Sequence, residues 1–214
     1  MVKINLVEKG KLLLDRIYDL EGIIQWGGYF ALFAIIFAET GLFFGFFLPG
    51  DSLLVTAGLL ANTVGFNMYV LNILLIIAAV SGDAVGYYFG KKVGQTLFKR
   101  EDSKLFKREY LLKTKIFYEK YGGKTILLAR FIPIIRTFAP IVAGTAGMSY
   151  KKFAMYNIVG GILWVTSMIW TGYLLAVSFP RIIESIHILI LVIIIMSFVP
   201  IFIEYWKHKK NEKK

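Results

Sequence analysis

Four charged side chains stand inside strongly apolar stretches of the sequence. Glu39 and Asp51 lie in one stretch, and Arg130 and Arg136 lie in another. A charge at the centre of a membrane helix costs roughly 2.5 to 3.5 kcal/mol, so four unpaired charges would cost about 10 kcal/mol, comparable to the whole stability of a domain. These groups must therefore meet partners, water or a substrate.

The two arginines have the chemistry to bind a phosphate group. A guanidinium stays charged in apolar surroundings, and its forked N–H donors match phosphate oxygens. The structural alternatives are ion pairs with Glu39 and Asp51, or arginine side chains that reach the membrane surface from a helix end. Because ionisable residues inside a membrane mark functional sites, we favour Arg130 and Arg136 as ligands of a lipid phosphate.

Glu39 and Asp51 have two candidate tasks. They could balance the arginines while the site is empty, or they could carry protons that couple transport to a gradient. Proton coupling would use the acids, because a desolvated carboxyl group can titrate near neutral pH and arginine cannot. Asp51 follows Pro49 and Gly50, so capping the helix that begins there is a competing role.

Other polar and aromatic side chains receive lesser roles. Asp83 stands beside a ridge of glycines at every fourth position, which permits close helix packing, and could support the site or bond a neighbouring backbone. Tyr87 and Trp164 fit the aromatic belt at the membrane surface. His187 and His208 have no companions at metal-ligand or triad spacing, and the chain has no cysteine. We therefore predict no metal, no cofactor and no catalytic residue.

The composition identifies the elements that position these groups. With 57% hydrophobic residues, residues 1–214 are too apolar for an ordinary soluble domain, and we predict a single all-α integral membrane domain. The net charge of +11 is carried mainly by loops beside apolar spans. That placement indicates contact with anionic lipid headgroups rather than with nucleic acid.

The apolar pattern divides this domain into six segments. They are an amphipathic N-terminal helix (1–21), a first hairpin-plus-span repeat (23–90), a basic loop with an amphipathic helix (91–124), a second hairpin-plus-span repeat (125–177), a last transmembrane helix (188–206) and a basic tail (207–214). Since a spanning helix needs about 20 residues, the long stretch after residue 22 is divided into a membrane helix at 23–38 and a re-entrant hairpin at 40–60.

The remaining boundaries follow from prolines and charge. The turn of the first hairpin is expected at 48–52, and spans are expected at 68–90 and 153–177. The second hairpin occupies 125–148, where prolines and glycines interrupt the apolar stretch.

Basic residues set the orientation. The segment 91–124 has eleven Lys or Arg residues against four acids, and the tail 207–214 is also basic, so both are placed in the cytoplasm. Counting crossings from that tail, the first hairpin opens outward and the second opens inward. A hairpin followed by a span therefore occurs twice in opposite orientations, which predicts an inverted repeat with its site near the midplane.

Several motifs together resemble the DedA family, whose shared region is the VTT (SNARE-associated) domain. The resemblance covers roughly residues 25 to 175 and rests on these segments: Glu39-Thr40-Gly41, Phe47-Leu48-Pro49-Gly50-Asp51, Gly82-Asp83 with Gly86-Tyr87 and Gly90, Arg130-Phe131-Ile132-Pro133 with Arg136, and Ala143-Gly144. It implies a bacterial inner-membrane protein with two opposed re-entrant hairpins, related to lipid scramblases of the endoplasmic reticulum.

The same resemblance implies a function. Family members are described as returning undecaprenyl phosphate across the membrane for envelope synthesis, often with dependence on the proton-motive force. Glu39, Asp51, Arg130 and Arg136 match the family's functional positions. We therefore predict a multi-pass lipid transporter, not an enzyme, with a cytoplasmic C-terminus. Alternatives are a general phospholipid scramblase, a proton-coupled ion transporter and, less favoured, a lipid phosphatase, since the groups that phosphatase chemistry needs are missing.

Overall fold

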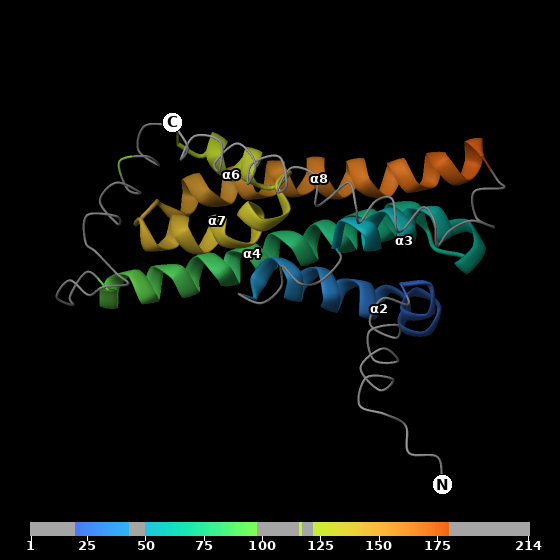
Figure 1. The fold of residues 1–214 in the computed structure, drawn as a ribbon, viewed down its shortest axis with the longest axis horizontal. Coiled ribbons are helices and arrows are strands. Elements are labelled where there is room, and N and C mark those ends of the chain that lie inside the picture. The colour runs from blue at the N-terminus through green and yellow to red at the C-terminus, as the bar shows by residue number, and fades with distance from the viewer. Residues whose placement is uncertain (1–19, 43–49, 98–115, 117–121, 180–214) are drawn as a thin grey trace, which may run out of the picture.

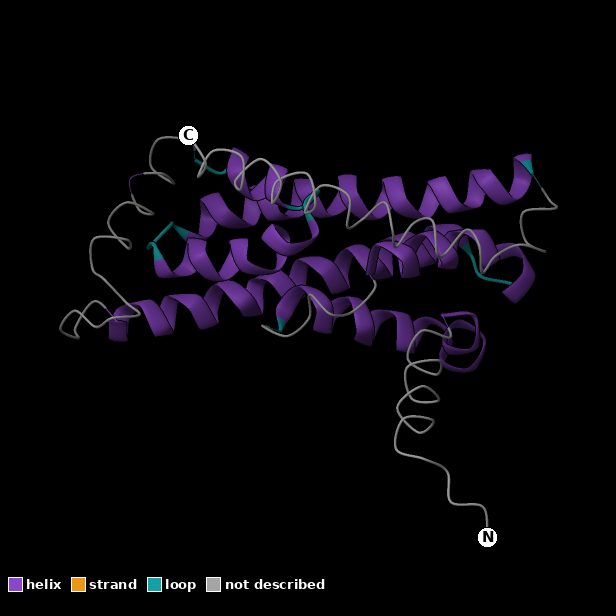
Figure 2. Cartoon of the chain, viewed as in Figure 1, coloured by secondary structure: helices purple, strands orange, loops and turns teal. Residues whose placement is uncertain are grey.

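The computed structural model describes residues 20–42, 50–97, 116 and 122–179, and these residues are helical apart from short turns (Figure 2). The elements are α2 (Leu20–Gly41), α3 (Gly50–Val64), α4 (Met68–Leu97), α6 (Lys124–Ala129), α7 (Pro133–Thr145) and α8 (Tyr150–Ser178). Within this part of the chain the all-α prediction is confirmed. The predicted N-terminal amphipathic helix, most of the basic loop, the last span and the tail lie outside the described residues.

Helices α4 and α8 are long and apolar enough to cross a membrane. They contain 30 and 29 residues. Their candidate spans are Met68–Val93, with mean hydropathy 2.0, and Tyr150–Ser178, with mean hydropathy 1.6. Only 33% of the most apolar window of each is buried inside the bundle, so most residues of these windows are at least partly exposed. The helices predicted at 68–90 and 153–177 are confirmed, although α4 continues to Leu97.

Helix α2 contains the segment predicted as a membrane helix at 23–38, but it is not one continuous helix. Gly28 has φ 51° and ψ −142°, in a region of positive φ that favours glycine, and the helix bends there. The part after Gly28, residues 29–41, is about 20 Å long, shorter than the roughly 30 Å hydrocarbon core. The helix predicted at 23–38 lies within α2, but its sequence gave no sign of the bend at Gly28, because this glycine is surrounded by apolar neighbours.

Three shorter helices complete the bundle. Helix α3 has 15 residues with Asp51 in its first turn, α6 has 6, and α7 has 13 and begins at Pro133. Proline suits a first helical position because its missing N–H would have no partner there. Its restriction on the preceding residue also fits the extended backbone of Ile132, which separates α6 from α7.

Two of the short helices pack against a long helix from the other half of the chain (Figure 1): α3 lies along α8, and α7 lies along α4. Glycines allow the close approach in both pairs. A β-carbon at Gly58 would lie 2.0 Å from the carbonyl oxygen of Ile169, and one at Gly172 would lie 2.0 Å from that of Val55. Any side chain at these positions would force the helices apart.

The second pair repeats the arrangement of the first. A β-carbon at Gly144 would lie 2.1 Å from the carbonyl oxygen of Tyr87, and one at Gly90 would lie 2.0 Å from that of Ile141. In both pairs, each glycine faces the carbonyl of the residue three positions before the partner glycine. The two interfaces therefore share one register.

Candidate functional site

Five ionisable side chains from five elements meet inside the bundle. Glu39 comes from the end of α2, Asp51 from the start of α3, Asp83 from α4, Arg130 from the residue after α6, and Arg136 from the first turn of α7. Four of them are buried, and the Asp51 side chain is 15% exposed. The structure thus brings together every charged residue that the sequence nominated.

Arg136 binds the two acids of the first half. Its Nη1 donates a hydrogen bond to Oδ1 of Asp51 at 2.5 Å, and its Nη2 donates to Oε1 of Glu39. The forked guanidinium therefore connects α7 with the end of α2 and the start of α3. This pairing matches the structural alternative considered from the sequence, in which the arginines neutralise Glu39 and Asp51.

Gly50 makes room for Glu39. A β-carbon at Gly50 would lie only 1.4 Å from Oε2 of Glu39, so the carboxyl group occupies space that any other residue would fill. Gly50 is also the first residue of α3. A carboxylate at a helix N-terminus is stabilised by the positive end of the helix dipole, which adds to the attraction of Arg136.

Arg130 has a different set of partners. Its Nη2 donates to Oδ2 of Asp83 and to Oδ1 of Asn157. Asn157 is buried and is fixed in turn, because its Nδ2 donates to the carbonyl oxygen of Val80 at 3.0 Å. The Arg130 side chain runs over Gly160, where a β-carbon would lie 3.3 Å from Cδ. Arg130 is thus bound to the two long helices, α4 and α8.

Trp164 lies near both arginines and is fully buried. Its Nε1 donates to Oδ1 of Asp51 at 2.8 Å, and its ring centroid is 4.6 Å from Cζ of Arg136 and 5.8 Å from Cζ of Arg130. Both distances are within the range of cation–π attraction. The prediction that Trp164 belongs to a surface aromatic belt was wrong, and so was the same prediction for buried Tyr87.

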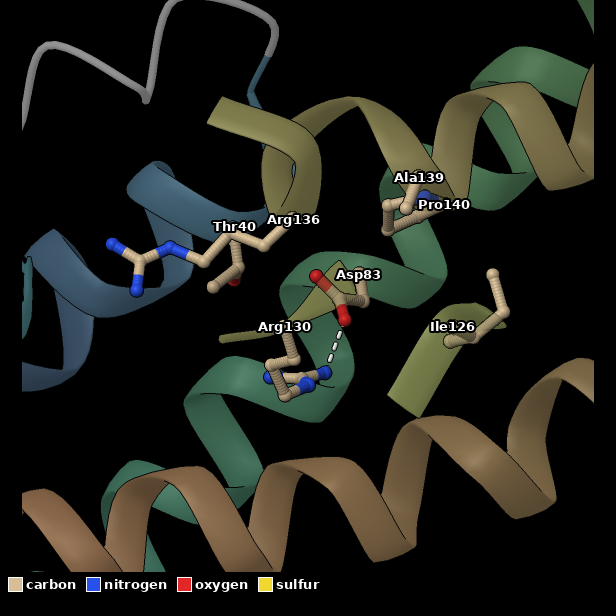
Figure 3. A pocket seen from close by; sticks show the side chains of 7 residues that line it. All are labelled: Thr40, Asp83, Ile126, Arg130, Arg136, Ala139 and Pro140. Atoms are coloured by element: carbon tan, nitrogen blue, oxygen red, sulfur yellow. Dashed lines mark hydrogen bonds and ion pairs between the residues drawn. The ribbon is translucent and has the colours of Figure 1, made fainter. Parts of the chain in front are cut away.

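A small cavity touches both arginines. Thr40, Asp83, Ile126, Arg130, Arg136, Ala139 and Pro140 line it. In Figure 3, Arg130 points to Asp83, whereas Arg136 extends toward α2. The cavity has room for about one water molecule. Among the described residues, Nη1 of Arg130 and Nε of Arg136 are buried without a hydrogen-bond partner, so both arginines retain donor capacity.

The cluster carries an excess of carboxyl groups. Two guanidinium groups face three carboxyl groups, which leaves one formal negative charge when all five are ionised. Buried charge of one sign is costly without a partner. An anion that enters this site must therefore displace a carboxylate from an arginine or be accompanied by a proton.

The charged residues of the site were predicted from the sequence, but two neutral partners and one ion pair were not. Asn157 and Trp164 gave no signal because each lies within the apolar stretch of α8. Asp83 was placed among the supporting residues, and the structure makes it the carboxyl partner of Arg130. No group of three or more metal-ligating side chains is arranged to hold a metal ion within the described part of the chain.

Comparisons with known proteins identify relatives over most of the chain. The VTT domain matches residues 48–174. Protein DedA of Escherichia coli (strain K12) is 50% identical over 184 residues, covering 85% of this chain and 84% of that protein. Inner membrane protein YqjA of the same strain is 31% identical over 193 residues, covering 86% and 87%. An uncharacterized membrane protein of Mycobacterium leprae is 41% identical over 184 residues, covering 86% and 82%. No solved structure matches the chain.

Proposed function

The chain belongs to the VTT-domain (DedA) family of membrane proteins, and from this premise we propose that it transports a phosphate-bearing lipid across the bacterial cytoplasmic membrane. The proposed substrate is undecaprenyl phosphate, returned for reuse in envelope synthesis. Its headgroup passes through the polar cluster while its tail stays in the bilayer. This movement requires no covalent chemistry.

The observation that carries the proposal is that two buried arginines line the same cavity. Forked guanidinium donors suit phosphate oxygens, and both side chains have a donor atom without a partner among the described residues. The cavity holds only about one water molecule, so a phosphate group enters when the ion pairs separate. On this proposal the structure corresponds to a closed site, in which the ion pairs are formed.

The proposed transport path uses two opposed re-entrant hairpins. We assign the hairpin predicted at 40–60, which includes most of α3, to the side that opens outward. The hairpin predicted at 125–148, which includes α6 and α7, opens inward, and the C-terminus lies in the cytoplasm. Helices α3, α6 and α7 are too short to cross a membrane. The shared glycine register of the α3/α8 and α7/α4 interfaces supports an inverted repeat, whose site is expected between the halves.

Proton coupling follows from the excess carboxyl group. When a phosphate group binds the arginines, the negative charge of the cluster increases unless a carboxyl group takes up a proton. Glu39 and Asp51 are the proposed proton carriers or charge-balancing groups, because both face Arg136. Binding of the lipid phosphate is therefore expected to strengthen as the pH falls.

The test is transport of undecaprenyl phosphate between the leaflets of liposomes that contain the purified protein. The double variant Arg130→Lys/Arg136→Lys keeps both charges for the ion pairs but removes the forked donors, and we expect transport at least about tenfold slower. Lys124→Ala, an exposed change outside the cavity, is the matched control and should transport at the wild-type rate. Equal rates for the double variant and the wild type would contradict the proposal.

The same liposomes separate the alternative functions. If phosphatidylethanolamine moves as fast as undecaprenyl phosphate and pH has no effect, the protein is a general phospholipid scramblase. Ion uptake driven by a pH gradient without lipid movement would identify an ion transporter. Release of inorganic phosphate from the lipid, lost in the arginine variant, would identify a lipid phosphatase.

A further inference from the structure

Trp164 lies close to both arginines and donates a hydrogen bond to an acid of the cluster. Its ring faces Arg136 at 4.6 Å and Arg130 at 5.8 Å, and its Nε1 donates to Oδ1 of Asp51 at 2.8 Å. It comes from α8, whereas Asp51 begins α3, so this bond joins the site to a long helix. A ring needed only to fill space would not require the N–H donor.

Asp51 has two donors in this structure. Oδ1 accepts a hydrogen bond from Nη1 of Arg136 at 2.5 Å and another from Nε1 of Trp164. An anionic headgroup that takes Arg136 removes the first donor. A carboxylate left inside the bundle without a partner is strongly unfavourable, and the indole N–H is then the donor that still satisfies it.

Arg136 gains from the same ring in both states. The indole face attracts a guanidinium whether its N–H groups point to carboxylates or to phosphate oxygens, because cation–π attraction uses the face of the planar group. Trp164 is fully buried, and its helix is held to α3 by Gly58 and Gly172, so its position is fixed by packing.

We propose that Trp164 is a positioning residue: its N–H retains Asp51, and its ring retains Arg136, while Arg136 exchanges a carboxylate for the phosphate of the substrate. This inference rests on the proposed function and adds the residue that makes the exchange possible. Loss of the N–H is expected to weaken the bound state more than the empty state, because Asp51 keeps Arg136 as a donor only when the site is empty.

The experiment measures binding of undecaprenyl phosphate to the full-length protein in lipid nanodiscs. Trp164→Phe keeps an aromatic face and removes the donor, and we expect binding about tenfold weaker, as for loss of a hydrogen bond to a charged group. Trp170→Phe, a change on the same helix that packs against Tyr69 and Tyr173, is the matched control and should bind as the wild type does. If Trp164→Phe fails to fold, benzothienylalanine at position 164 removes the N–H and keeps the bicyclic shape.

A double-mutant cycle with Asp51→Ala separates positioning from packing. Asp51→Ala removes a competitor for Arg136, so it should retain or strengthen binding, and adding Trp164→Phe should then change the affinity less than twofold. Three outcomes would overturn the role of Trp164. The first is that Trp164→Phe weakens binding equally in the wild type and in Asp51→Ala. The others are an unchanged affinity of Trp164→Phe and a loss of binding in Asp51→Ala alone. A wild type that binds undecaprenyl phosphate no better than undecaprenol would overturn the proposed function itself.

Discussion

The two arginines occupy one cavity but are held in contrasting ways. Arg130 is matched by one carboxylate and one neutral amide on the long helices α4 and α8. Arg136 faces two carboxylates on the elements of the first half, α2 and α3. The surplus of negative charge therefore lies beside Arg136, while Arg130 is balanced. From this difference we expect exchange of partners to be easier at Arg136 than at Arg130.

The largest expected effect is from Arg136→Ala. This change leaves Glu39 and Asp51 inside the bundle without their cation, and breaking a buried ion pair in this way costs about 3 to 5 kcal/mol. We expect a large fall in melting temperature in detergent. Neutralising both acids in the same protein, with Glu39→Gln and Asp51→Asn, should restore much of the loss. If Arg136→Ala alone is as stable as the wild type, the pairing of Arg136 with Glu39 and Asp51 is refuted.

Neutralising one acid at a time should separate the two arginines. Asp83→Asn removes the hydrogen-bonded carboxylate of Arg130, and we expect a loss of about 3 kcal/mol in stability. Asp51→Asn leaves Arg136 paired with Glu39, so its loss should be smaller. It should also strengthen lipid phosphate binding and flatten the dependence on pH, because the surplus charge is gone. Thermal melting tests the two stability losses, and binding measured across pH tests the effect of Asp51→Asn on the lipid phosphate. A larger stability loss for Asp51→Asn than for Asp83→Asn would contradict the difference between the two arginines.

Two glycines beside the site offer a steric version of the same test. Gly50→Ala places a methyl group 1.4 Å from Oε2 of Glu39, so the carboxyl group must leave Arg136 or α3 must shift, at a cost of about 2 kcal/mol. Gly160→Ala meets Cδ of Arg130 at 3.3 Å, a contact that a long side chain relieves at less than about 1 kcal/mol. The melting temperatures of the two variants test this difference. An equal fall in melting temperature for both variants would contradict the packing at Gly50.

The smallest expected effect is from Asn157→Ala. It removes one acceptor of Arg130 and the bond to the Val80 carbonyl, for a loss of about 1 to 2 kcal/mol. Thr166→Val removes the bond to Asn72 on the same pair of long helices but outside the cavity. Both should be mildly destabilised, while transport should fall only for Asn157→Ala. Equal transport by the two variants would show that Arg130 needs no amide partner.

The long helices and the charged residues could be predicted from the sequence for a clear physical reason. Hydropathy over about 20 residues identifies α4 and α8, and a charge inside an apolar stretch is conspicuous. The pairing of Arg130 with Asp83 and of Arg136 with two acids depends on tertiary packing, which spacing along the chain does not encode. The proposed roles of these residues in transport remain predictions.

The neutral residues that matter at the site and in α2 could not be predicted from the sequence. Asn157 lacks a charge, and Trp164 is an aromatic residue in an apolar helix, so both look ordinary in sequence. Gly28 lies next to Gly27 within an apolar stretch, and only its positive φ shows that it interrupts α2. These residues become informative only once their burial or backbone conformation is known.

The glycine contacts have a mechanical consequence. Gly58 and Gly172 join α3 to α8, and Gly90 and Gly144 join α4 to α7, at distances that leave no clearance for sliding. We therefore expect α3 to move together with α8, and α7 to move together with α4. On this expectation the units that move are two interleaved helix pairs rather than consecutive segments. Trp164 and Asp51 belong to one pair, and Arg136 belongs to the other.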